Sequence, residues 1–271
     1  MSNRDIPIGV FDSGIGGLTV LKEIVRELPS ESTIYLGDTA RVPYGIRSPE
    51  TVARYSFENT RFLFSRGIKL LVVACNTVSS ISLDSIRKTV SIPVVGVIEP
   101  GAGAAVAATR NKKVGVIGTA ATIRSSAYAK AIKAMDGTVE VFGLACPLFV
   151  PLVEEGWTEG MIVELTAERY LKELKQKGID TLVLGCTHYP LLKEVLARVM
   201  GGEVELIDSA IETARVIRDI LEKDSLTRRK AYPLTREFYV TDSPDKFLEV
   251  GERFLGSRME FIRKIELESE V

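Results

Sequence analysis

The chain has 271 residues, 45% of them hydrophobic, and its 35 basic and 36 acidic residues give a formal net charge of −1 at pH 7. This length and apolar content can supply two hydrophobic cores, so we expect two domains. Because the charges nearly balance, the chain has no excess of positive charge that would indicate binding to nucleic acid or to an anionic membrane, and a small substrate is favoured.

The first five residues lead straight into a predicted strand, without the hydrophobic stretch of a secretory signal. No apolar run approaches the length of a transmembrane helix. Three cysteines in such a chain predict reduced thiols in the cytosol rather than a disulfide scaffold.

Short runs of branched aliphatic residues predict eight strands along the chain. They fall at residues 6–10, 33–36, 70–74, 94–97, 114–117, 139–142, 181–184 and 204–207. Amphipathic helices separate many of them, and one apolar stripe consists of Val163, Ala167, Tyr170, Leu171 and Leu174. This alternation predicts an α/β protein with parallel sheets and helical crossovers.

The last part of the chain predicts one more helix and two short strands. The helix carries Ala210, Ala214, Ile217 and Leu221, and the strands lie near residues 238–240 and 261–262. This segment is too small to form a domain, so we expect it to pack back on one of the two halves.

Two of the predicted strands belong to copies of one local pattern, and each ends in a cysteine. GIKLLVVAC ends at Cys75, and GIDTLVLGC ends at Cys186. Residues 8–13 likewise have a counterpart in 114–119, and Val42-Pro43 has one in Val150-Pro151, in the same order. The repeat predicts two related domains.

Ligands bind at the carboxyl ends of strands in open parallel sheets. If the two strand ends face each other, Cys75 and Cys186 lie on opposite sides of a small substrate. That arrangement could take a proton from one face of a carbon and return one to the other.

A glycine turn follows the first strand, where Asp12 and Ser13 precede Gly14, Gly16 and Gly17. Such a turn lets backbone N–H groups approach an anion. The spacing is not that of a dinucleotide-binding site. The alternative is that Asp12 or Ser13 only caps the following helix.

The segment 37–45 after the second strand is too long and polar for a tight turn, and such loops often carry binding groups. Its counterpart, 146–156, is more apolar but contains Glu154 and Glu155. A carboxylate beside apolar groups tends to have a raised pKa and can serve in proton chemistry. The alternative is that these two acids begin an exposed helix. In the repeat, Cys146 aligns with Asp38 and not with the paired cysteines, so we expect Cys146 to be a small buried residue.

His188 is the only histidine of the chain, which excludes a site that needs two. A zinc site is further disfavoured because there is no Cys-x-x-Cys pair. His188 follows Cys186 by two residues and can influence the ionisation of its thiol. Asn76, Thr77 and Thr187 add short polar groups at the same strand ends, suited to carboxylate or ammonium recognition.

These motifs make the chain similar to the glutamate racemase family, within the cofactor-independent aspartate/glutamate racemase superfamily. The matching segments are residues 9–14, 37–38, 43–45, 74–77, 118–119 with Thr122, 151–154 and 184–190. The resemblance implies two α/β domains related by a pseudo-twofold axis, with the active site between them. The first domain is expected over 1–98 and 209–271, and the second over 99–208.

The resemblance also implies conversion of L-glutamate to D-glutamate for bacterial peptidoglycan, in the cytoplasm, without pyridoxal phosphate or metal. A homodimer is compatible with the family. Cys75 and Cys186 would act as an acid–base pair, with Asp12 near the first and with Glu154 and His188 near the second. The residues implied in substrate binding are Asp12, Ser13, Tyr44, Gly45, Asn76, Thr77, Thr119, Thr122, Thr187 and His188. Asp38 would be a supporting residue, and closure of the domains over the substrate is expected.

Three other functions are compatible with parts of this pattern. A non-catalytic two-domain binder could use the same cleft, but it would not need paired thiols. A thiol–disulfide oxidoreductase would be expected to carry a close Cys-x-x-Cys pair. A racemase for aspartate or another acidic amino acid remains open within the superfamily.

Overall fold

The computed structural model describes residues 4–228 and 233–267, and within them it contains two parallel sheets. The first sheet has six strands in the order β10-β9-β2-β1-β3-β4. They are β1 (Ile8–Asp12), β2 (Thr33–Gly37), β3 (Leu70–Val73), β4 (Val94–Gly96), β9 (Arg236–Val240) and β10 (Ile262–Lys264).

The second sheet has four strands in the order β6-β5-β7-β8. They are β5 (Lys113–Gly118), β6 (Glu140–Ala145), β7 (Thr181–Gly185) and β8 (Glu205–Ile207). This order repeats the order β2-β1-β3-β4 of the first sheet, and all strand pairs are parallel. The sequence repeat is therefore a repeat of topology, and the prediction of parallel α/β sheets is confirmed.

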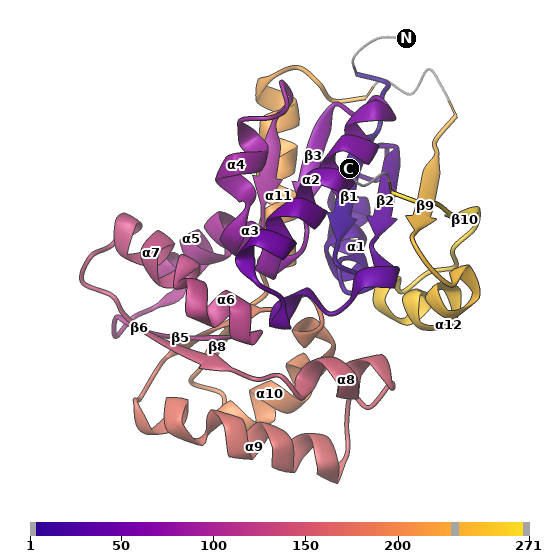
Figure 1. Ribbon diagram of the computed structural model, residues 1–271. Coiled ribbons are helices and arrows are strands. Elements are labelled where there is room, and N and C mark those ends of the chain that lie inside the picture. Colours follow the sequence, from indigo (N-terminus) through magenta and orange to yellow (C-terminus); the bar gives the residue numbers. More distant parts are fainter. Residues whose placement is uncertain (1–3, 229–232, 268–271) are drawn as a thin grey trace.

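Helices connect the strands and cover the sheets (Figure 1). They are α1 (Leu18–Glu27), α2 (Pro49–Ser65), α3 (Asn76–Ile81), α4 (Leu83–Arg87), α5 (Ile98–Ala108), α6 (Ala120–Ser125), α7 (Ala127–Met135), α8 (Phe149–Glu154), α9 (Met161–Gln176), α10 (Lys193–Met200), α11 (Ser209–Lys223) and α12 (Pro244–Leu255). Three short 3₁₀ turns are η1 (Thr39–Arg41), η2 (Tyr44–Ile46) and η3 (Tyr189–Leu192). Along the described chain, no helix is long and apolar enough to cross a membrane.

The central strands β1, β3 and β7 are buried at every position, as expected when helices cover both faces of a parallel sheet. A glycine in β1 and a glycine at the equivalent place in β5 each leave room for the isoleucine that precedes the neighbouring, cysteine-bearing strand. A Cβ at Gly9 would lie 2.6 Å from Cδ1 of Ile68, and a Cβ at Gly115 would lie 2.5 Å from Cδ1 of Ile179. Both halves thus use the same glycine–isoleucine contact to bring the cysteine-bearing strand beside the central one.

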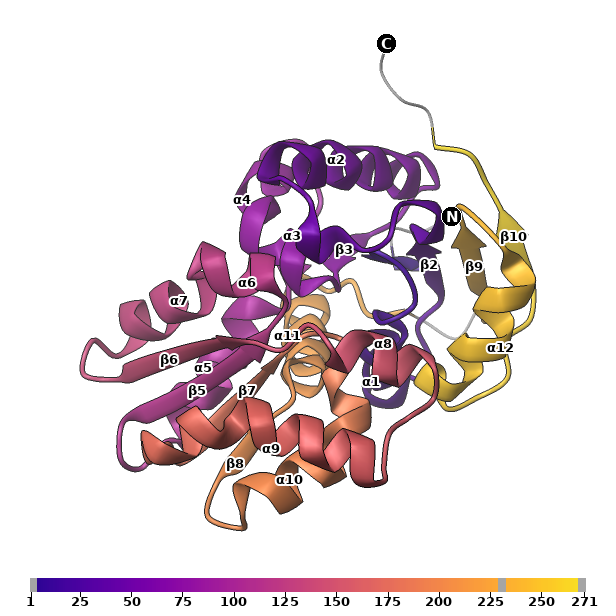
Figure 2. The same ribbon diagram turned by 60° about the horizontal axis from the view of Figure 1, so that its bottom comes forward.

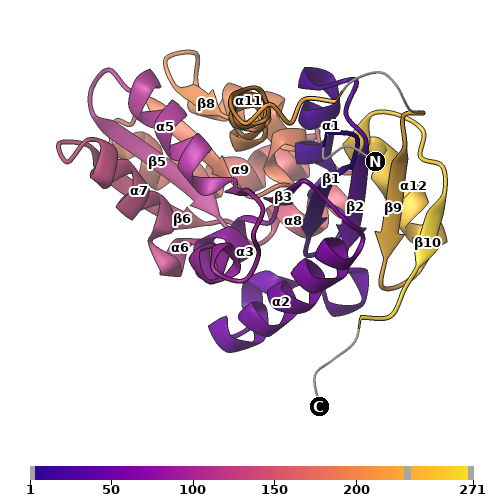
Figure 3. The same ribbon diagram turned by 90° about the horizontal axis from the view of Figure 1, so that it is seen from above.

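The C-terminal segment returns to the first sheet, where β9 pairs with β2 and β10 pairs with β9 (Figure 3). The helix α11 packs on both α1 and α5, so it lies between the two halves. The boundaries at residues 98/99 and 208/209 remain a prediction.

Several expected boundaries were wrong. The first strand begins at Ile8 rather than Ile6, because Pro7 has no N–H to donate to a neighbouring strand. The last strand begins at Ile262, because Phe261 has a left-handed φ of 59° and is 72% exposed. The segment 146–156 is not a loop throughout: it contains α8, and Glu154 ends this helix instead of beginning one.

Candidate active site

A cavity of about 180 Å³ lies where the carboxyl ends of the central strands of both sheets meet. Ser13 follows β1, Cys75 follows β3, Thr119 follows β5 and Cys186 follows β7. The other lining residues are Gly14, Ile15, Val42, Pro43, Tyr44, Gly45, Ile46, Asn76, Thr77, Ala120, Pro147, Val150, Pro151, Glu154, Thr187 and His188. Both cysteines therefore line one cavity, as the strand-end argument predicts.

Cys75 lies at the buried end of β3, directly before α3, with 5% of its surface exposed. Its thiol donates a hydrogen bond to Ser13 Oγ at 3.5 Å. Burial first, and the nearby charge of Asp12 second, raise the pKa of Cys75 to about 12. At neutral pH this cysteine is a thiol and can deliver a proton.

Asp12 does not line the cavity but lies behind it, 1% exposed, close enough to Cys75 to act on its charge. Its Oδ2 accepts from the N–H of Gly14 at 2.9 Å, while its Oδ1 is buried and has no hydrogen-bond partner within the described chain. Burial raises the pKa of Asp12, and the charge of His188 and three backbone N–H groups oppose this rise. A buried carboxyl with a free oxygen can hold a proton next to Cys75.

A chain of three groups extends from the second thiol. Cys186 Sγ lies 3.9 Å from His188 Nδ1, and His188 Nε2 lies 3.1 Å from Glu154 Oε1. Burial lowers the pKa of His188, but the hydrogen bonds and charges of Cys186 and Glu154 outweigh it and raise that pKa to about 10. The hydrogen bond from His188 in turn lowers the pKa of Glu154. At neutral pH the structure thus places an imidazolium between Cys186 and a carboxylate.

The polar wall of the cavity is held by side chains from both halves. Thr119 Oγ1 lies 3.0 Å from Thr77 Oγ1 and 3.1 Å from Thr122 Oγ1, and it caps α6. Thr122 itself does not line the cavity; it fixes Thr119 from behind. Tyr128 OH donates to Asn76 Oδ1 at 2.7 Å, so the amide nitrogen of Asn76 is left without a partner among the described residues. That N–H₂ group is a free donor for a carboxylate.

Asp38 is a supporting group whose side chain is fully buried behind the cavity. It accepts hydrogen bonds from the hydroxyl of Tyr44, from Arg41 Nε at 2.7 Å and from Thr241 Oγ1 at 2.9 Å. Tyr44 lines the cavity, so Asp38 supports the site by holding the Tyr44 side chain in place. Cys146 is fully buried, as expected, and its thiol points to Leu144 O at 3.8 Å.

Three residues that support the site were not identified from the sequence. Tyr128 orients Asn76 as described, Thr19 of α1 donates to Thr187 O at 2.9 Å, and the ring of Phe254 lies 5.2 Å from that of His188. Each contact joins segments far apart in the chain, so no local pattern indicates it.

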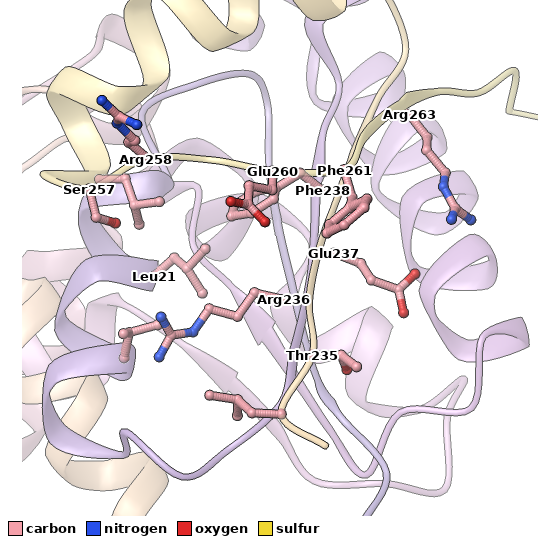
Figure 4. Close-up of a pocket in the computed structure, with 13 residues that line it drawn as sticks. Leu21, Thr235, Arg236, Glu237, Phe238, Ser257, Arg258, Glu260, Phe261 and Arg263 are labelled. Atoms are coloured by element: carbon pink, nitrogen blue, oxygen red, sulfur yellow. The ribbon is translucent and has the colours of Figure 1, made fainter. Parts of the chain in front are cut away.

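A larger cavity of about 420 Å³ lies elsewhere, between α1, the strand β9 and the approach to β10 (Figure 4). Arg236, Arg258, Glu260 and Phe261 contribute to its walls, but none of the predicted site residues does. Over residues 4–228 and 233–267, no three His, Cys, Asp or Glu side chains are grouped so as to hold a metal ion.

The family model for Asp/Glu/Hydantoin racemases matches residues 8–217. The chain belongs to this racemase family. A glutamate racemase of Geobacter metallireducens is 59% identical over 97% of this chain and 97% of its own length. The resemblance drawn from the motifs is confirmed.

Solved racemase structures share the fold. Glutamate racemase from Francisella tularensis, crystallised with D-glutamate, superimposes with a TM-score of 0.93 at 41% identity, covering 98% of this chain and 100% of that one. The Escherichia coli glutamate racemase, crystallised with L-glutamate and the activator UDP-MurNAc-Ala, gives 0.79 at 30% identity, with 97% and 99% covered. The expected fold class is confirmed.

Proposed function

We propose that this protein is a glutamate racemase that interconverts L-glutamate and D-glutamate by proton transfer at the α-carbon. The observation that carries the proposal is that two buried thiols, one from each sheet, line the same small cavity. The 59% identical glutamate racemase over nearly the whole chain supports glutamate over aspartate as the substrate.

The two thiols have different neighbours. The positive charge of the His188 imidazolium lies beside Cys186, with 3.9 Å between Nδ1 and Sγ, and we assign the role of base in one direction to Cys186. Cys75, whose pKa is raised to about 12, is the thiol. In one direction Cys186 takes the α-proton and Cys75 gives a proton to the opposite face.

This turnover leaves Cys75 as thiolate and Cys186 as thiol, which is the form that works on the product enantiomer. The opposite reaction resets the pair. Another turnover in the same direction requires that Cys75 regain a proton and that Cys186 lose one. Asp12 lies beside Cys75, and His188 with Glu154 lies beside Cys186, so we assign to these groups the exchange of those two protons with solvent.

Negative charge develops on the α-carbon and its carboxylate as the proton leaves. Fixed donors in a site from which water is excluded stabilise such charge. We assign this role to the amide nitrogen of Asn76 and to the hydroxyls of Thr77, Thr119 and Thr187, with Ser13, Tyr44 and Gly45 completing the substrate wall. Closure of the two halves over glutamate is part of the proposal.

The remaining parts of the proposal concern the cell. We place the enzyme in the cytoplasm, where it supplies D-glutamate for bacterial peptidoglycan. A homodimer, suggested only by the family, is tested by light scattering of the purified protein.

Polarimetry tests the proposed activity. The reduced protein, without added cofactor, is incubated with L-glutamate, with D-glutamate and with L-aspartate. Both glutamate solutions should lose rotation completely, and kcat/KM should be equal in the two directions because enantiomers have equal free energies. Racemisation of aspartate but not of glutamate would assign the enzyme to the alternative substrate, and a lack of activity on both would reject the proposal.

A further inference from the structure

We infer that Phe254 of α12 is a positioning residue that sets the orientation of the His188 imidazole and thereby the proton chemistry of Cys186. The inference deepens the proposed function and rests on it. It assigns a role in the second half's proton relay to the C-terminal segment, whose strands belong to the first sheet.

The contact between the two rings is close and buried. Their centroids are 5.2 Å apart with an interplanar angle of 82°, and Phe254 and His188 are 1% and 8% exposed. Perpendicular rings at this separation are in a favoured aromatic geometry. The two imidazole nitrogens form hydrogen bonds with Cys186 and Glu154. These two bonds alone leave the imidazole free to rotate about the line between Cys186 and Glu154. Phe254 packs on the imidazole and limits this rotation, together with Gly16, where an added Cβ would lie 2.5 Å from Nδ1 of His188.

Figure 2 shows α12 on the same side of the molecule as α8, the helix that ends at Glu154. A Cβ at Gly156 would lie 2.5 Å from Nη1 of Arg253, so Arg253 packs on the turn that follows α8. Hydrogen bonding from His188 lowers the pKa of Glu154, and the charge of Lys246, also on α12, adds to this effect. Thus α12 approaches both the imidazole and its carboxylate partner.

Cys75 is supported differently. Its polar neighbours, Ser13 and Asp12, come from the end of β1 beside it. A change on α12 should therefore disturb the Cys186 side of the reaction first.

The charged and titratable groups around the imidazole determine the pH at which it loses its proton. They are Cys186 after β7, Glu154 on α8 and Asp12 at the end of β1, with Lys246 acting through Glu154. If Phe254 is replaced by leucine, the imidazole can tilt about the line between Cys186 and Glu154, which turns its two N–H groups out of line with these partners. Because both hydrogen bonds favour the charged imidazole, their weakening should move the titration midpoint of His188 to lower pH.

The experiment compares Phe254→Leu with Phe238→Leu. Phe238 is also a buried ring of the C-terminal segment, 3% exposed, but it lies against Tyr35 and the cavity of Figure 4. Since the chain has a single histidine, its imidazole signal in NMR spectra is assigned without ambiguity. Each variant is titrated by NMR, and kcat and KM for L- and D-glutamate are measured across pH.

For Phe254→Leu we expect a lower His188 midpoint and a kcat lowered about three- to tenfold, as the loss of one aromatic pair implies, with KM little changed. Phe238→Leu should keep the His188 midpoint and the pH profile of the unaltered protein. If Phe254→Leu does not fold, Phe254→Met, which keeps most of the volume, is measured in its place.

An unchanged midpoint and pH profile in the folded Phe254 variant would overturn the inference, and so would equal changes in both variants. The proposed function fails separately, if the unaltered protein does not racemise glutamate. The NMR titration still reports on the ring contact in that case, so the two failures are distinguishable.

Discussion

Replacing Glu154 by glutamine should lower the pKa of His188. The substitution keeps the shape of the side chain but removes the negative charge that lies 3.1 Å from Nε2. Since that charge favours the imidazolium, His188 should lose its proton at lower pH than in the unaltered protein.

The magnitude follows from the positions of the two groups. The pKa of His188 is raised from 6.5 to about 10, and a shift of this size corresponds to roughly 5 kcal/mol. Cys186 and Glu154 share the effect, and the side chain of Glu154 is 46% exposed, so solvent screens its part. We therefore assign about one pKa unit, ~1.4 kcal/mol, to Glu154.

The same pair makes stability depend on pH. A raised histidine pKa contributes stability that is fully present below pH 6.5 and is lost as the pH rises through about 10. The lowered pKa of Glu154 contributes stability that is lost in acid. The free energy of unfolding should thus differ between Glu154→Gln and the unaltered protein by ~1 kcal/mol near neutral pH, and the difference should vanish above about pH 10.

NMR titration of the single histidine and urea unfolding at several pH values measure both effects. Glu155→Gln is the matched control, because Glu155 is the adjacent, exposed glutamate. The reasoning is refuted if Glu154→Gln leaves the His188 midpoint in place, or if Glu155→Gln shifts it equally.

Three other substitutions test the site. Cys75→Ser and Cys186→Ser should each lower kcat by about 10²- to 10⁴-fold while calorimetry still detects glutamate binding, and robust racemisation by either would exclude the two-thiol mechanism. Thr19→Val should lower the free energy of unfolding by ~1–3 kcal/mol, because Thr187 O and Gly16 O lose a buried donor; an unchanged denaturation midpoint would contradict this. Asp38→Asn should cost ~3 kcal/mol of stability and raise KM, because Arg41 loses the buried negative charge and an amide N–H₂ in place of Oδ2 cannot accept from Tyr44; an unaltered KM would show that Tyr44 keeps its place without the carboxylate.

The repeated strands and the two strand-end cysteines were predictable because burial on both faces produces continuous aliphatic runs. The helix α8 was not predictable in this way. Pro147 and Pro151 give its segment the composition of a loop, yet Pro151 occupies the first turn, where an N–H has no helical partner to lose.

The supporting contacts were beyond a sequence argument for a different reason. Asn76 and Tyr128 are joined by a hydrogen bond across 52 positions, and Phe254 meets His188 only because β9 and β10 return the chain to the first sheet. Periodicity describes one element at a time and does not specify which elements meet.

The most direct test of the central claim follows L-glutamate in heavy water with the reduced protein, recording optical rotation and loss of the α-proton together. Proton transfer through a thiol on each face predicts that rotation decays to zero while deuterium enters the α-position, and that D-glutamate formed early already carries deuterium. Loss of rotation with the original proton retained at the α-carbon would contradict the mechanism, and no change in either signal would contradict the activity.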